Sequence, residues 1–128
     1  MITWNNLDTL EAFKNLSKAE RVNIAEAMSG ENGAERVKTY STPMAEGLAY
    51  NYAAKQVDDK VLEDLQKLAD EAQLTEKFEA LYNGEVINTG EKRMVLHHLT
   101  RGQLGEAVNA DGTDKRAFYK EQQQKIAD

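Results

Sequence analysis

Two adjacent histidines, His97 and His98, are the first residues whose side chains could bind a metal ion. Neighbouring residues of a helix point about 100° apart, so the two imidazoles converge poorly on one ion, unlike histidines at positions i and i+4. The sequence has no cysteine, and neither a third histidine nor a glutamate at ligand spacing accompanies the pair. We therefore predict no metal site, with one histidine packed against the core edge and the other solvated.

Three basic residues, Arg93, His97 and Arg101, are spaced at i, i+4 and i+8, which would place them on one face of a helix. Lys92 adjoins the first of them. Such an electropositive stripe could face a phosphate or pair with a carboxylate elsewhere. A solvated or salt-bridged face is the more common role of such a pattern, so the stripe alone predicts no function.

The rest of the sequence offers no nucleophile and no phosphate-binding loop. Ser17, Ser29 and Ser41 lack the Gly-x-Ser-x-Gly context of a nucleophilic serine and are typical of helix caps or turns. The glycines after residue 83 are spread among polar links rather than gathered in a loop that binds phosphate. The residue types alone therefore indicate no catalytic set.

Apolar residues at helical spacing predict the elements that would position these side chains. The clearest is a helix over 58–72, which Asp58 would cap at its N-terminus. The other predicted helices are 4–16 capped by Thr3, a helix from the Ser17–Glu20 capping box to Gly30, 74–83 with Thr75 as its candidate cap and Gly84 as its end, 92–101, and a last helix from Asp114 onward capped by Thr113.

Residues 48–52 alternate in the period-2 pattern of a short strand. Its partner would be the segment 37–41 or would lie outside this chain. Residues 34–40 could themselves form a short helix or part of an edge strand. The predicted fold class is therefore mainly α, with at most one short β-strand or hairpin.

The composition fits one soluble domain or part of one. Of the 128 residues, 41% are hydrophobic, which is enough for a core and argues against disorder. The 16 basic and 22 acidic residues give a net charge of −6, which disfavours nucleic acid or an anionic membrane as a partner. With no cysteine, no signal peptide and no membrane-spanning run, a cytoplasmic location is expected.

The run from Gly84 to Arg101, GEVINTGEKRMVLHHLTR, resembles a signature near the N-terminus of the glucose-6-phosphate isomerases. That family reads Gly-Glu-x-Ile-Asn, then Thr and an acidic residue, then Arg-x-Val-Leu-His, then Leu-Arg. The matching residues are Gly84, Glu85, Ile87, Asn88, Thr89, Arg93, Val95, Leu96 and His97, with Arg101 an approximate match. Upstream, residues 48–74 resemble the family's short strand and first long helix, although Ala53, Ala54 and Gln56 depart from the usual wording.

The resemblance implies an enzyme with two α/β sugar-isomerase domains, neither of which would be complete in this chain. Residues 1–128 are expected to be its N-terminal helical part, which wraps the first of those domains and contributes to a homodimer. The implied reaction interconverts glucose 6-phosphate and fructose 6-phosphate through an enediol(ate), with a carboxylate base and no metal or organic cofactor. Its catalytic groups are expected beyond Asp128, so none is assigned here, and Arg93 and His97 would be supporting residues near the parent's active site.

The leading hypothesis is thus an N-terminal isomerase fragment that is inactive alone and meets its sugar phosphate substrate only through the missing domains. The alternative is a free-standing helical interaction module that shares the segment by chance or descent. A reading frame that continues into a Gly-Ile-Gly-Gly-Ser-like segment would favour the first hypothesis. A native stop codon after Asp128 would favour the second.

Overall fold

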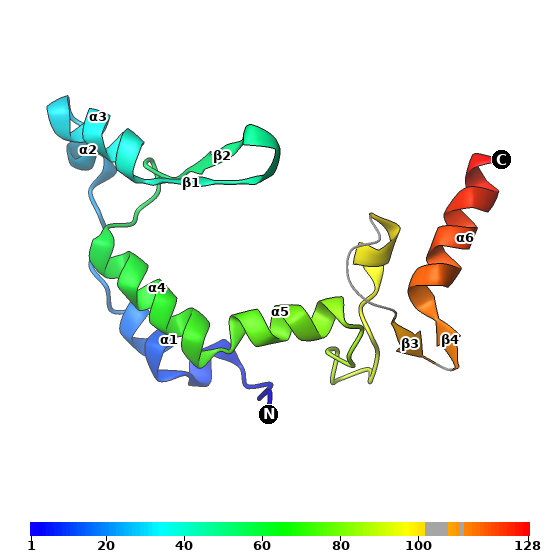
Figure 1. Ribbon diagram of the computed structural model, residues 1–128. Helices are drawn as coiled ribbons and strands as arrows, with labels where there is room; N and C mark the ends of the chain where they lie inside the picture. The colour runs from blue at the N-terminus through cyan, green and yellow to red at the C-terminus, as the bar shows by residue number, and fades with distance from the viewer. Residues whose placement is uncertain (102–107, 111) are drawn as a thin grey trace. The chain divides into compact units, whose positions relative to one another are not determined.

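The computed structural model describes residues 1–101, 108–110 and 112–128 (Figure 1). The chain divides into two compact units, one made of residues 7–68 and the other of residues 1–6 with 69–128. Helices predominate among the described residues, which confirms the predicted mainly α class. None of the helices in this described part is both long and apolar enough to cross a bilayer.

The unit of residues 7–68 begins with short helical segments rather than the two long helices that the sequence predicts. These segments are the 3-10 turn η1 (Leu7–Thr9) and the helices α1 (Glu11–Leu16), α2 (Ile24–Ala27) and α3 (Gly30–Thr39). Leu10 and Ala12 are buried where α1 starts. The predicted helix over 4–16 is therefore shorter than expected, and Thr3 does not cap it.

The capping box predicted at Ser17 is wrong. The amide of Ser17 donates to the Phe13 carbonyl oxygen at 2.9 Å, and its hydroxyl donates to the Lys14 carbonyl oxygen at 2.8 Å, so Ser17 ends α1. Helix α2 begins later, where the Asn23 side chain accepts a hydrogen bond from the Glu26 amide. A serine can form such local hydrogen bonds at either end of a helix, and here Ser17 forms them at the C-terminal end of α1.

Gly30 begins helix α3 instead of ending the one before it, which also corrects the sequence prediction. Its φ of 57° lies in the left-handed region that favours glycine. Gly33, one turn further on, is buried, and a Cβ there would overlap the backbone of Met28. This close approach allows α2 and α3 to follow one another with hardly any connection.

A hairpin follows α3, and it resolves the alternatives left for residues 34–52 (Figure 1). Strand β1 (Ser41–Pro43) pairs antiparallel with β2 (Ala49–Asn51), in a register that sets Thr42 opposite Tyr50. Residues 34–39 belong to α3, and the strand's partner lies within the chain at residues 41–43, which overlap the candidate segment 37–41 only at Ser41. A 3-10 turn, η2 (Ala45–Gly47), connects the strands.

Arg36 fastens the segment after the hairpin to α3. Its Nε donates to the Ala53 carbonyl oxygen at 2.7 Å, and its Nη2 donates to the carbonyl oxygens of Lys55 and Val57. The guanidinium carbon also lies 4.1 Å from the centroid of the Tyr40 ring. One side chain thus satisfies three backbone carbonyls of an irregular segment, in which Ala53 is buried.

Helix α4 (Asp59–Glu71) is the element that the sequence predicts best. The Asp58 carboxylate accepts a hydrogen bond from the Val61 amide at 2.8 Å, which confirms the predicted N-cap. The apolar stripe is only partly covered, since Val61, Leu62 and Leu68 are half-buried and Leu65 is 40% exposed.

The unit of residues 1–6 and 69–128 is built from a helix at each end and short elements between them. These elements are α5 (Leu74–Tyr82), the 3-10 turn η3 (His97–Thr100), the strands β3 (Asn109–Ala110) and β4 (Thr113–Asp114), and α6 (Lys115–Ala127). The antiparallel pair β3–β4 is a second short hairpin, where the sequence predicted at most one. Ala80, Leu99 and Val108 are the most deeply buried apolar residues in the described part of this unit.

Two predicted caps in this unit are also wrong. Helix α5 starts at Leu74, as the predicted range 74–83 does, so Thr75 lies inside it, and the residue before the helix is Gln73 in the left-handed conformation. Thr113 belongs to β4, and the side chain that caps α6 is Asp114, which accepts from the Arg116 amide at 3.0 Å. Thr3 instead donates through its amide and hydroxyl to the Gln73 side-chain oxygen, at 2.8 and 2.9 Å.

The contact between Tyr40 and Asp59 makes the stability of the 7–68 unit sensitive to alkaline pH. The Tyr40 hydroxyl donates to the Asp59 carboxylate at 2.7 Å, and this hydrogen bond, with burial and the carboxylate charge, raises the pKa of Tyr40. A raised pKa means that the folded protein holds the proton more tightly than the unfolded chain does. The stabilisation is therefore complete below the ordinary tyrosine pKa of about 10 and is lost as the pH rises above it.

Tyr40→Phe should lower stability near neutral pH and make the loss of stability above about pH 10 less steep than in the starting protein. Urea midpoints measured across this pH range test the expectation. Tyr50→Phe, which alters an exposed ring of the same hairpin, is the control and should keep the starting slope. An unchanged alkaline slope in Tyr40→Phe would contradict the role of the hydrogen bond.

Candidate functional site

The candidate site forms where helix α5 ends. Gly84 takes a φ of 73°, and the amides of Gly84 and Glu85 donate back to the carbonyl oxygens of Leu81 and Ala80 at 3.1 and 2.9 Å. This confirms Gly84 as the residue that closes the helix. The last carbonyls of a helix have no partner within it, and the carbonyl oxygen of Tyr82 is one of these.

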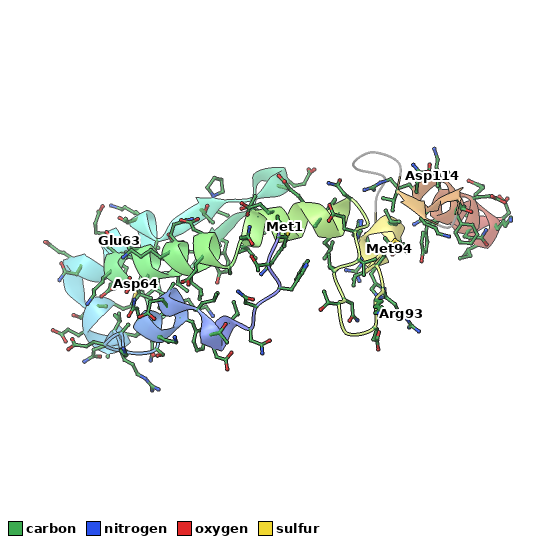
Figure 2. The ribbon with its side chains drawn as sticks, turned by 90° about the horizontal axis from the view of Figure 1, so that it is seen from below. Met1, Glu63, Asp64, Arg93, Met94 and Asp114 are labelled. Carbon is green, nitrogen blue, oxygen red and sulfur yellow. The ribbon has the colours of Figure 1, made fainter. Side chains whose placement is uncertain are left out.

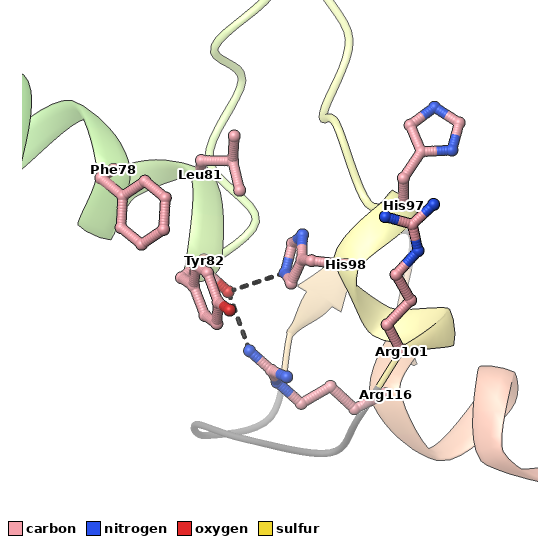
Figure 3. Close-up of a pocket in the computed structure, with 7 residues that line it drawn as sticks. All are labelled: Phe78, Leu81, Tyr82, His97, His98, Arg101 and Arg116. Carbon is pink, nitrogen blue, oxygen red and sulfur yellow. Dashed lines mark hydrogen bonds between the residues drawn. The ribbon is translucent and has the colours of Figure 1, made fainter. Parts of the chain in front are cut away.

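The Tyr82 carbonyl oxygen accepts hydrogen bonds from two residues far along the chain (Figure 3). Arg116 Nη2 donates to it at 2.8 Å, and His98 Nε2 lies 3.3 Å from it. Because a carbonyl can only accept, His98 must carry a proton on Nε2. The His98 ring also packs on the Tyr82 ring, with 4.8 Å between the ring centroids.

The helix predicted over 92–101 is wrong. Asn88 and Arg93 form an isolated antiparallel bridge, with backbone hydrogen bonds of 3.2 and 3.1 Å, and the Asn88 side chain accepts from the Glu91 amide at 3.1 Å. Lys92 has a φ of 54°, which a continuous helix does not allow. An asparagine that bonds its neighbouring backbone favours a turn over a helix, and helical structure is confined to η3.

Because residues 92–101 do not form one helix, the three residues of the predicted basic stripe do not share one helical face. Arg93, labelled in Figure 2, is exposed at the bridge. It is not one of the residues that line the pocket. His97 is exposed and His98 half-buried, which confirms the expectation of one solvated and one packed histidine. Only His97 and Arg101, of the three residues in the stripe, reach the same pocket.

The other residues that resemble the family signature lie around the same loop. Gly84 and Glu85 follow α5 in the chain. Ile87, Asn88 and Leu96, in the segment that leads from α5 to η3, are half-buried. Gly84 packs so closely against Val108 that a Cβ at position 84 would overlap the Val108 side chain. The signature therefore includes the residues that shape this loop as well as residues that line the pocket.

Sequence reasoning missed Arg116, which is the most buried charged residue of the described chain at 6% exposure. It stands in the first turn of α6, where the helix dipole disfavours a cation. An arginine at that position is a usable signal, because it indicates a specific partner that outweighs the dipole. Here the partner is the carbonyl end of α5.

The pocket has a volume of about 330 Å³ and is lined by Phe78, Leu81, Tyr82, His97, His98, Arg101 and Arg116 (Figure 3). The charged and imidazole side chains of its lining are arginines and histidines, and no carboxylate of the described residues is part of it. Among the described residues, no three histidine or carboxylate side chains gather in a group that could hold a metal ion. The pocket thus offers hydrogen-bond donors and positive charge rather than a nucleophile.

Gly84→Ala should destabilise the protein by about 2–4 kcal/mol, because the left-handed backbone disfavours alanine and the added methyl group overlaps Val108. Urea unfolding followed by circular dichroism measures the change. Gly90→Ala is the matched control, since the nearest atom to a Cβ there is Asn88 Oδ1 at 3.7 Å. Equal stability of the two variants would contradict the structural role of Gly84.

Comparison with known proteins places the sequence in a family. The model of the family described as phosphoglucose isomerase matches residues 51–128, which include the entire pocket. A glucose-6-phosphate isomerase of Treponema denticola is 50% identical over 128 residues, covering 96% of this chain and 24% of that protein. The same enzyme name belongs to relatives in Treponema pallidum (strain Nichols) and Borreliella burgdorferi (strain ATCC 35210), each 40% identical over 98% of this chain.

The chain spans about a quarter of the length of the curated relatives that it matches. The similarity nevertheless extends over nearly all of its residues, so it is not confined to the Gly84–Arg101 run. The matched family model also covers more than half of the sequence. The chain therefore belongs to the phosphoglucose isomerase family.

Proposed function

We propose that this chain is the N-terminal helical part of a glucose-6-phosphate isomerase, the enzyme that interconverts glucose 6-phosphate and fructose 6-phosphate. The observation that carries the proposal is the match of 96% of the chain, at 50% identity, to a protein of that name. Because the same match covers only 24% of the relative, the activity is assigned to the larger parent protein.

The chain is proposed to be inactive by itself. The reaction moves a proton between two neighbouring carbons of the sugar and, in the mechanism that the family resemblance implies, uses a carboxylate as the base. The pocket at the end of α5 is lined by hydrogen-bond donors and apolar side chains, and none of the described residues places a carboxylate in it. The catalytic groups and the sugar phosphate site are therefore assigned to the rest of the parent, which is proposed to act as a cytoplasmic homodimer without a metal or organic cofactor.

Arg93 and His97 are proposed to support the active site of the parent from outside it. Both side chains are exposed in this chain and leave the same loop region, Arg93 from the Asn88–Arg93 bridge and His97 from η3. Neither is in an ion pair with a described carboxylate. They are thus available to contact the remainder of the parent.

An isomerase assay tests the assignment of activity to the parent. The purified 128-residue chain should give no conversion of glucose 6-phosphate above background, whereas the parent that contains it should convert it readily. A coupled assay for fructose 6-phosphate provides the measurement. Clear turnover by the chain alone would contradict its proposed inactivity, and an inactive folded parent would contradict the isomerase assignment.

Arg93→Gln and His97→Gln, made in the parent, should each lower kcat by up to about 10²-fold if they hold active-site groups in position. The melting temperature should stay near that of the unmodified parent, because both side chains are exposed. Arg21→Gln, at an exposed position in the other unit, is the charge-matched control. Unchanged kcat and KM in both variants would remove the supporting role.

A further inference from the structure

The pocket at the end of α5 holds a buried positive charge without a counter-charge among the described residues. Arg116 is 6% exposed, and its Nη2 is used by the Tyr82 carbonyl oxygen. Its Nε is buried and has no hydrogen-bond partner. A buried guanidinium that is only partly hydrogen-bonded is costly, so such groups normally face an anion.

A second guanidinium, that of Arg101, comes to the same pocket from the end of η3. No described carboxylate forms an ion pair with either arginine. The two side chains leave different elements, α6 and η3, yet both line the cavity (Figure 3). Figure 3 shows the Arg116 guanidinium beside Tyr82 and the Arg101 guanidinium turned toward His97, so the two positive charges line different parts of one cavity.

The histidines fit the same interpretation in different ways. His98 donates through Nε2 to the Tyr82 carbonyl oxygen, and its Nδ1 is buried without a hydrogen-bond partner among the described residues. His97 is exposed and lines the pocket as a further polar side chain. The remaining lining is formed by Phe78, Leu81 and Tyr82, which offers a surface for an uncharged part of a ligand.

The chemistry of this lining selects among possible occupants. A metal cation would be repelled by the two arginine side chains, and an apolar ligand would leave the buried Nε of Arg116 without an acceptor. A phosphate group has enough acceptor oxygens to face two guanidiniums at once, and arginine matches its geometry through paired hydrogen bonds. The volume of about 330 Å³ lies within the range of pockets for small ligands.

We propose that this pocket binds the phosphate group of a small molecule, with Arg101 and Arg116 as the residues that contact it. The phosphate could be free or esterified, and the apolar side of the pocket would favour an ester. The assignment rests on charge, burial and hydrogen bonding within this chain, and does not depend on the isomerase function proposed for the parent.

Amide NMR spectra of the 128-residue chain, titrated with sodium phosphate, test the proposal. Sodium chloride keeps the ionic strength constant, because exposed charges are screened by salt. Saturable shifts are expected for amides around residues 78–82, 97–101 and 116. Parallel titrations use glucose 6-phosphate and glucose. Tighter binding of glucose 6-phosphate than of phosphate supports an ester site, equal binding supports a site for the phosphate group alone, and equal binding of glucose overturns the proposal.

Arg101→Gln should weaken phosphate binding by about tenfold or more, as expected for the loss of a hydrogen bond to a charged group. Arg21→Gln removes the same charge from the other unit and should bind as the starting chain does. Arg116→Lys keeps the charge but loses the paired donors, and it should weaken binding as well. If Arg116→Lys fails to fold, Arg101→Gln decides, because Arg101 is exposed. The absence of saturable shifts in the starting chain, or the same affinity in Arg101→Gln, overturns the proposal.

Discussion

The carbonyl oxygen of Tyr82 is the acceptor on which the second unit of the chain depends. A helix end normally leaves such an oxygen to water, but here it draws in side chains from 16 and 34 residues further along. The arrangement requires α5 to stop where it does, and that stop depends on a glycine in the left-handed conformation. Leu99 and Val108 are fully buried nearby, one within η3 and the other just before β3. The C-terminal end of α5 thus holds η3 and α6 through hydrogen bonds to a backbone carbonyl as well as through apolar packing.

The sequence predicted well those features that depend on local, unambiguous patterns. Helix α4 has a wide apolar stripe and an aspartate directly before it, and the structure reproduces both. The alternation over residues 48–52 predicted a strand, and Gly84 predicted a helix end. The family resemblance of the Gly84–Arg101 run is confirmed by comparisons that cover far more of the chain than that run.

The failures share a physical cause. Ser17, Thr75 and Thr113 are all suited to cap a helix, but a cap is used only where the chain direction leaves amides free, and a pattern over four residues does not contain that information. The spacing of Arg93, His97 and Arg101 would place them on one face only if they lay on one helix. The turn formed around Asn88 prevents that helix from forming. Arg116 was overlooked because its partner is a main-chain oxygen, which residue types do not identify, and only its place in the first turn of a helix indicated a partner.

The anchoring of the N-terminus gives the two units different optical signatures. Trp4, the only tryptophan of the sequence, belongs with residues 69–128, and its ring lies 5.3 Å from the Lys77 ammonium nitrogen. The unit of residues 7–68 instead contains the contacting rings of Tyr40, Tyr50 and Tyr52. Indole emission therefore reports on one unit, while this tyrosine cluster contributes to the near-ultraviolet spectrum of the other. If the two units unfold at different denaturant concentrations, the natural chromophores of the chain would reveal the order without an added label.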